Sequence, residues 1–215
     1  MDALLKRRMM MMAGSGPTPP GPSLLPEGYT LLSYVENPLG NSAYINTRVN
    51  PGTQTGFVID AMSYDELGGS GYGCIFGGRY SSGNADFQLT SYTTSGNSGT
   101  LRTGTNSYNA HLPAKNTRFT AQLSGTTYSI GGNDYSITYN VNSSRAAYVY
   151  IFALHSGSSV VQNGHGRIYS LSFYQGGNKI RDYVPCKNPN NVVGFYDLVS
   201  ESFVGPTSGT LVGVE

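Results

Sequence analysis

Residues 167–174 read Arg-Ile-Tyr-Ser-Leu-Ser-Phe-Tyr and carry the clearest structural signal in the chain. Apolar and polar side chains alternate along this stretch, which places them on opposite faces of an extended strand. The turn signal Gly176-Gly177-Asn178 follows, and then a second strand-like run over residues 179–184. Because Gly and Asn accept positive φ angles at little cost, the two runs are predicted to form an antiparallel hairpin.

The same pattern extends through most of the chain. Residues 135–139, Tyr-Ser-Ile-Thr-Tyr, also alternate and follow the turn signal at residues 131–134. Short runs rich in Val, Ile, Tyr, Phe and Thr are predicted strands. They cover residues 29–35, 56–62, 74–78, 87–92, 118–123, 128–130, 135–139, 147–154, 167–174, 179–184 and 193–198. Many short strands separated by frequent turns predict an all-β sandwich or barrel.

The composition is neutral and poor in charge. Lys and Arg number 13 and Asp and Glu 12, so the net charge is +1 and charged residues make up 12% of the chain, about half of the ~25% usual in globular domains. This balance argues against nucleic-acid binding by the bulk surface. Aromatic residues make up 12%, which argues against a disordered chain. The length of 215 residues suits one β-domain.

The N-terminal residues differ from the rest and divide the chain into three parts. Residues 1–13 consist mostly of helix formers and are predicted to form a short helical arm, residues 14–26 form a Pro-rich and Gly-rich linker, and residues 27–215 form the β-domain. A helix this short is marginal by itself, so we expect the arm to become ordered when a partner buries its Leu and Met face. The candidate partner-binding residues are Leu4, Leu5, Lys6, Arg7, Arg8, Met9 and Met12.

Export and membrane signals are weak. The longest strongly apolar run, residues 146–154, is far below the ~20 residues that a membrane span needs. The apolar run that follows Lys6-Arg7-Arg8 ends after five residues, shorter than the roughly 7–15 of a signal peptide. We therefore expect synthesis in the cytoplasm without an export signal. Cys74 and Cys186 are either buried thiols or a pair, and the sequence leaves both possibilities open.

The sequence contains few patterns that are typical of catalytic or metal-binding sites. The Gly-rich residues 68–73 lack the Gly-Lys-Ser/Thr ending of a phosphate-binding loop. The histidines at positions 111, 155 and 165 are scattered, and the chain has neither a Gly-x-Ser-x-Gly elbow nor a calcium-loop pattern. The sequence therefore predicts no catalytic residues, no metal site and no cofactor.

Paired carboxylates leave one enzymatic alternative open. Glycosidases need two carboxyl groups facing one glycosidic bond. The available candidates are Asp60 with Asp65 and Glu66, and Asp197 with Glu201. Neither set forms the alternating pattern that would place two acids on one face of a single strand.

The 17 tyrosines open a further possibility. Tyr offers apolar area with a polar tip and is favoured at binding surfaces. In a chain rich in Ser, Thr, Asn and Gly, this indicates a glycan-binding protein. Tyr is also an ordinary strand residue, so the sequence leaves the glycan-binding residues unknown.

Several of these segments also carry a family resemblance. They are residues 25–29, 44–46, 75–79, 147–154, 166–174, 179–185 and 194–197. Together they resemble the concanavalin A-like, LamG-type jelly-roll domain of phage and prophage structural proteins from gut bacteria. The resemblance implies a two-sheet antiparallel jelly-roll sandwich displayed on a virion as part of a fibre, a tail or a head decoration. Some related domains bind sugars or cleave them, but the catalytic acids and the calcium-and-sugar loop of those members do not match this sequence.

Two hypotheses follow for the function. In the first, the chain is a non-enzymatic bacteriophage virion protein, in which the arm binds capsid or tail proteins and the β-domain projects as a homo-oligomer, with a trimer as one possibility. In the second, it is a lectin-like module that adheres to host or mucus glycans. A virion fibre that binds glycans satisfies both, and a glycoside hydrolase remains a third hypothesis.

Overall fold

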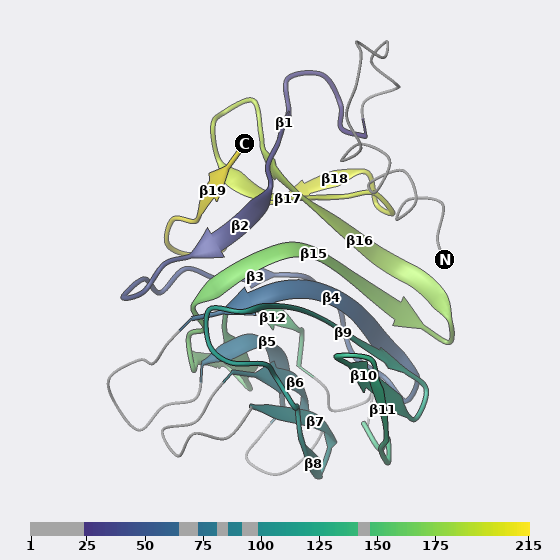
Figure 1. Cartoon of the computed structure of the whole chain (residues 1–215). Coiled ribbons are helices and arrows are strands. Elements are labelled where there is room, and N and C mark those ends of the chain that lie inside the picture. Colours follow the sequence, from purple (N-terminus) through teal and green to yellow (C-terminus); the bar gives the residue numbers. More distant parts are fainter. Residues whose placement is uncertain (1–23, 65–72, 81–85, 92–98, 142–146) are drawn as a thin grey trace.

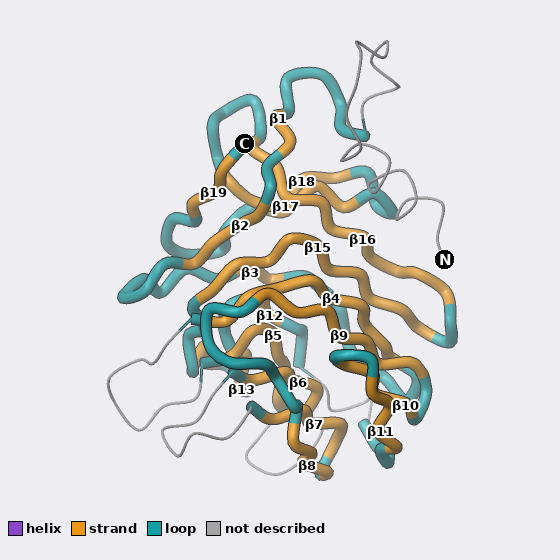
Figure 2. Tube along the Cα trace, viewed as in Figure 1, coloured by secondary structure: helices purple, strands orange, loops and turns teal. Residues whose placement is uncertain are grey.

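The computed structural model of the chain describes residues 24–64, 73–80, 86–91, 99–141 and 147–215 and shows two stacked β-sheets (Figure 1). Within these ranges the chain forms strands and loops without a helix (Figure 2), and so has no helix that could cross a membrane. The prediction of an all-β fold with two sheets is confirmed. The predicted arm at residues 1–13 and the linker up to residue 23 lie outside the described residues.

Among the described residues, the larger sheet contains eleven strands. Its main path runs β11 (Asn133–Ser136), β10 (Thr127–Ile130), β9 (Arg118–Ser124), β4 (Thr55–Ser63), β15 (Gly166–Gln175), β16 (Asn178–Lys187), β17 (Val193–Asp197) and β18 (Ser202–Val204). Three further strands join it: β1 (Thr30–Leu31) pairs with β16, β2 (Tyr34–Asn37) with β15, and β19 (Val212–Val214) with β2. The sheet therefore forks at β15, whose first residues pair with β2 and whose last residues pair with β16.

The smaller sheet contains eight strands. Its path runs β14 (Ser159–Val161), β13 (Leu154–Ser156), β5 (Cys74–Arg79), β6 (Asp86–Thr90), β7 (Thr100–Gly104) and β8 (Asn106–Asn109). The short strand β12 (Tyr150–Ile151) lies between β5 and β3 (Ile45–Asn46). Neighbouring strands are antiparallel in the described parts of both sheets, apart from β13 and β5, which run parallel.

The predicted hairpin at residues 167–184 is present and central. Gln175 pairs with Asn178, and the two-residue turn between them has φ angles of 57° at Gly176 and 82° at Gly177. These left-handed angles at both central positions match a type I′ hairpin turn, in which Gly avoids the steric cost that a Cβ atom would bring. On its other edge β15 pairs along its length with β4, so the hairpin anchors the larger sheet.

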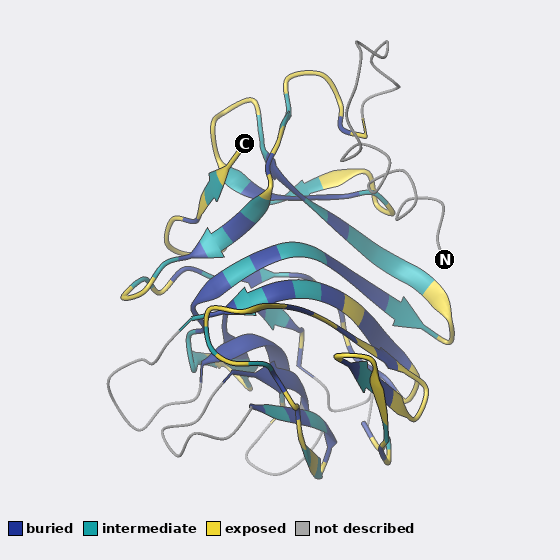
Figure 3. Cartoon of the chain, in the orientation of Figure 1, coloured by how far each residue is buried: buried dark blue, intermediate teal, exposed yellow. Residues whose placement is uncertain are grey.

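Aromatic side chains fill the space between the sheets. Phe57 and Phe173 come from the larger sheet and Phe76 and Phe87 from the smaller one, and all four are fully buried. Figure 3 shows buried residues along strands of both sheets. The ring centre of Phe76 lies 4.9 Å from that of Phe57, 5.5 Å from that of Phe173 and 5.9 Å from that of Phe87. The first two pairs are edge-to-face contacts, a favourable arrangement for aromatic rings, so Phe76 joins the two layers.

Some predicted strands are interrupted. The predicted strand 147–154 is divided into β12 and β13, because Phe152 adopts a left-handed φ of 62° that breaks the extended backbone. The predicted strand 29–35 likewise forms two short strands, and the strand predicted at 135–139 begins earlier, at Asn133, and ends at Ser136. The sequence prediction missed β3, β7, β8, β14, β18 and β19.

A second, smaller hydrophobic cluster lies outside the main core. It holds Leu25, Cys186 and Tyr196, with Tyr29 and Phe203 packed around them. The ring centre of Tyr29 lies 5.4 Å from that of Tyr196. Leu25 is 5% exposed, so the end of the predicted linker is fixed to the sandwich at this point.

Candidate functional site

The arm residues that the sequence singled out, from Leu4 to Met12, lie outside the described residues. The structure therefore leaves the predicted partner-binding role of the arm as a prediction. The described residues offer two other candidate surfaces, one on the outer face of each sheet.

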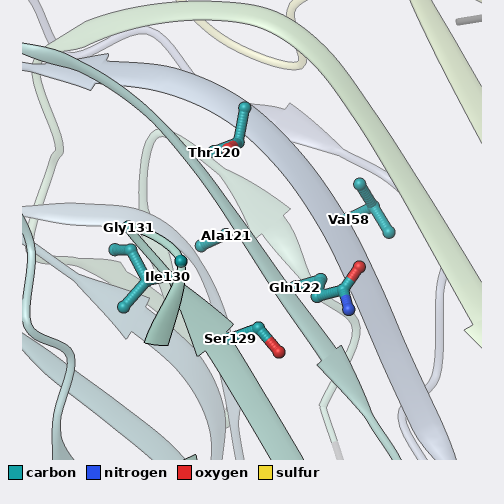
Figure 4. A pocket seen from close by; sticks show the side chains of 8 residues that line it. Val58, Thr120, Ala121, Gln122, Ser129, Ile130 and Gly131 are labelled. Atoms are coloured by element: carbon teal, nitrogen blue, oxygen red, sulfur yellow. The ribbon is translucent and has the colours of Figure 1, made fainter. Parts of the chain in front are cut away.

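A shallow pocket opens on the outer face of the larger sheet (Figure 4). Its volume is about 140 Å³, and its lining comes from β4, β9, β10 and the turn after β10. The lining residues are Val58, Thr120, Ala121, Gln122, Ser129, Ile130, Gly131 and Gly132. The described lining thus combines one amide, two hydroxyl groups and apolar surface, and it contains no charged side chain.

Strand register brings the key pocket residues side by side. Gln122 of β9 pairs with Val58 of β4 on one edge and with Ser129 of β10 on the other, and Figure 4 shows their three side chains on neighbouring strands. Buried and exposed residues alternate without a break along β9, so Thr120 and Gln122 point outward with Arg118. Within the described structure, the side chains of Thr120, Gln122 and Ser129 have no hydrogen-bond partner.

Next to the pocket lies a chain of arginine and tyrosine side chains. The guanidinium of Arg118 makes a two-pronged ion pair with Asp60 and lies 3.8 Å from the ring centre of Tyr169. Tyr169 in turn contacts Tyr34 at 5.6 Å between ring centres. The guanidinium of Arg167 lies 4.3 Å from the ring centre of Tyr34. We call this surface the arginine–tyrosine face.

The second carboxylate of the arginine–tyrosine face is also held by an arginine. Nε of Arg167 donates a hydrogen bond of 2.7 Å to Oε2 of Glu36. Burial and a hydrogen bond to Glu36 raise the pKa of Tyr64 above its usual value of 10. Both arginines therefore carry a matching carboxylate within the chain.

The outer face of the smaller sheet carries three stacked rings. The ring of Tyr150 lies between those of Tyr44, at 5.2 Å and 12°, and His155, at 4.4 Å and 7°. Nδ1 of His155 lies 3.3 Å from the carbonyl oxygen of Tyr148. Because the rings cover one another's faces, the middle ring offers its edge rather than a face to a ligand.

The candidate carboxylates Asp197 and Glu201 differ in burial. Asp197 is fully buried and accepts hydrogen bonds from the backbone N–H groups of Asp182 and Val199 and from the hydroxyl of Ser200. Arg181 lies 3.5 Å away. Glu201 is exposed in the following turn. This arrangement makes Asp197 a structural acceptor that holds the turn between β17 and β18.

The other proposed acid set is incomplete in the structure. Asp60 is engaged by Arg118 as described above, and Asp65 and Glu66 lie outside the described residues. The described residues contain no group of three or more His, Cys, Asp and Glu side chains that could hold a metal ion.

The histidines and cysteines take structural positions. His111 stacks on Tyr135 with ring centres 4.0 Å apart, and Nε2 of buried His165 lies 2.8 Å from the carbonyl oxygen of Asn41. Cys74 and Cys186 are both buried thiols that are not joined by a disulfide, which resolves the alternative that the sequence left open. Burial raises the pKa of Cys186 to about 12.

Comparisons with known proteins do not show a family for this chain. No family model matches the chain, and no curated protein matches it. Two solved structures that it resembles are a point mutant of NanB sialidase from Streptococcus pneumoniae and NanB with Optactamide, each at 14% identity and a TM-score of 0.47. The matches cover 71% and 73% of this chain but 26% of the other chains, so it spans about a quarter of their length. A likeness this distant carries no argument about either fold or function.

Sequence reasoning missed the pocket. The signal that marks it is the alternation over residues 118–124, Arg-Phe-Thr-Ala-Gln-Leu-Ser, whose outward positions hold four polar side chains in a row. The sequence gives no sign that the two arginines on this face would meet tyrosines, because those contacts join strands far apart in the chain.

Proposed function

We propose that this chain is a non-enzymatic structural protein of a bacteriophage virion, a head fibre, a head decoration or a tail-associated protein. Its N-terminal arm binds a capsid or tail protein, and its β-sandwich, a jelly roll of the concanavalin A-like type, is displayed outward as a homo-oligomer. The proposal rests on the sequence resemblance and on the layout of arm, linker and compact domain.

The structural observation that carries this proposal is the fixed entry of the linker. Leu25 is buried against Cys186 and Tyr196, and β1 then pairs with β16. A domain that buries the end of its linker has a defined point at which the linker joins the sandwich. This is a useful property for a module displayed on a particle.

Deleting residues 1–13 tests the arm. We expect the truncated protein to fold with an unchanged melting temperature and to be missing from purified particles, because the arm supplies the contact with the virion. The double variant L5D/M9D should behave in the same way, since it places charge on the apolar face of the arm. Leu39→Asp, at an exposed loop position, is the matched control. Normal incorporation of the truncated protein would contradict the proposed role of the arm.

A second candidate function is glycan binding, and the pocket on the larger sheet favours it. Its uncharged lining offers amide and hydroxyl groups that lack protein partners, beside an exposed apolar residue, Val58. Sugars present the complementary mixture of hydroxyl groups and C–H faces. Binding of the full chain to a broad glycan panel tests this function, with dissociation constants expected in the micromolar to millimolar range. Lack of binding across the panel would count against glycan binding and leave the virion proposal standing.

A further inference from the structure

The pocket is part of a longer row of side chains across five strands. In register, Ser129 pairs with Gln122, Gln122 with Val58, Val58 with Ser172, and Ser172 with Asp182. Residues directly opposite each other on neighbouring strands share one face of a sheet. The row thus reads polar, polar, apolar, polar, acidic, with Val58 at its centre.

The two halves of this row differ in their hydrogen bonding. Beyond Val58, the hydroxyl of Ser172 donates to Oδ1 of Asp182 at 2.7 Å, and Nζ of Lys179 donates to Oδ2 at 3.0 Å. On the pocket side, the side chains of Gln122 and Ser129 lack a protein partner within the described structure. The pocket side therefore holds the groups that are free to exchange water for a ligand.

Charge around the row favours a neutral ligand. The pocket lining has no charged side chain among its described residues. Asp134, which pairs with Ser129 in register, adds an exposed carboxylate beside the pocket, while Asp60 is paired with Arg118 and Asp182 with Lys179. An anionic ligand would have to compete with these carboxylates for their cations. A neutral ligand needs no such exchange and loses less hydration on binding.

Size and shape restrict the ligand further. The volume of about 140 Å³ is below the roughly 300–1,000 Å³ of pockets for drug-sized ligands. Val58 is 38% exposed and provides a small apolar floor. At the rim, a Cβ atom added to Gly131 or Gly132 would meet no other atom within 4 Å, so the edge of the pocket is open and a longer chain can leave it there.

We propose that this row is a subsite for one neutral pyranose unit of a glycan, and the proposal rests on the glycan binding proposed above. The C–H face of the sugar lies on Val58. The amide of Gln122 donates to one ring hydroxyl and accepts from another, and the hydroxyls of Thr120 and Ser129 bind neighbouring positions. Uronic and sialic acid units are disfavoured, because the lining offers their carboxylates no free cation.

Glycan binding by the full chain and its variants tests the subsite. The panel contains neutral oligosaccharides and matched acidic ones, and titration calorimetry or NMR gives the affinities. We expect Gln122→Ala to weaken binding of a neutral ligand about thirtyfold, the effect of losing two hydrogen bonds of about 1 kcal/mol each. Val58→Asp should abolish binding, since it places a charge under the sugar. Gln54→Ala, at an exposed turn position before β4, is the matched control and should leave the affinity unchanged.

The possible results distinguish failure of the subsite proposal from failure of glycan binding itself. Binding of neutral glycans that Gln122→Ala weakens and Gln54→Ala does not would support the subsite. Binding that His155→Ala abolishes while Gln122→Ala leaves it intact would move the site to the stacked rings and overturn the subsite but not glycan binding. A preference for acidic glycans would overturn the neutral ligand class. Failure of the unaltered chain to bind any glycan would overturn both the subsite and the proposed glycan binding.

Discussion

Asp60 of β4 and Arg118 of β9 form a diagonal, two-pronged ion pair, with Oδ1 2.7 Å from Nε and Oδ2 2.6 Å from Nη2. Tyr169 supports the guanidinium from one side at 3.8 Å. Charge-assisted pairs with this geometry are stronger and more directional than single contacts. The arginine–tyrosine face is therefore a pre-organised surface, because its long side chains already have little conformational freedom.

Replacing Asp60 by Asn removes the charge while keeping the shape. Because the side chain of Arg118 is 51% exposed, solvent screens the pair, and we expect a loss of about 0.5–1 kcal/mol in the free energy of unfolding. Urea unfolding at low and high salt measures this loss, and the difference between variant and unaltered chain should shrink at high salt. Asp134→Asn, on exposed β11, is the control. A salt-independent loss would show that the pair acts through packing.

Asp197→Asn should be much more damaging. The buried carboxylate accepts two backbone N–H groups and one hydroxyl and faces Arg181. An amide replaces one acceptor oxygen by a donor and leaves the arginine without a countercharge, so we expect a loss of about 2–4 kcal/mol in unfolding free energy. Glu201→Gln, in the exposed turn that follows, should change the stability by less than about 0.5 kcal/mol. Comparable small losses in both variants would contradict the role of Asp197 as a buried acceptor.

Phe76→Ala tests the contact between the layers. The variant removes a buried ring that contacts aromatic rings from both sheets, and we expect a cost of about 3–5 kcal/mol in unfolding free energy. Val214→Ala, at an exposed position of β19, should cost less than about 0.5 kcal/mol. Thermal and urea unfolding measure both. A small loss at Phe76 would show that the neighbouring rings move together and fill the space.

The buried thiol of Cys186 predicts instability in alkali. Burial raises its pKa from 9.0 to about 12 in the folded chain, so between these pH values the unfolded chain ionises and the folded chain does not. Stability is fully present below pH 9 and falls as the pH rises towards 12, at up to about 1.4 kcal/mol per pH unit for this group. Unfolding experiments between pH 8 and 10 measure the slope. Cys186→Ala should flatten it, and an unchanged slope would assign the effect to other groups.

The central strands of the two sheets could be predicted from the sequence better than the binding surfaces on their outer faces. The alternation over residues 167–174 and the Gly-Gly turn after it are local signals, and they correctly predicted the central hairpin. The division of residues 147–154 at Phe152 was missed, because a left-handed aromatic residue is imposed by tertiary contacts and has no local signature. Short strands such as β3 and β19 were missed for a similar reason, since two or three residues carry no measurable periodicity.

The candidate site shows the same limit. Each strand of the pocket could be predicted from its own alternation, but the position of Gln122 beside Val58 depends on the register between β9 and β4. Sheet register joins residues 64 positions apart here, and nothing local in the sequence determines it. The tyrosine content indicated a binding surface in general terms, whereas the pocket itself contains no tyrosine among its described lining residues.

The buried Leu25 and the β1–β16 pairing also determine how the domain would bear mechanical load. Within the described residues, a pull from the N-terminal side acts on the buried Leu25 and then on the two residue pairs that join β1 to β16. These contacts lie outside the main core between the sheets. They form a weak link that can yield under tension and lengthen the tether while the two sheets, and any surface they display, stay folded.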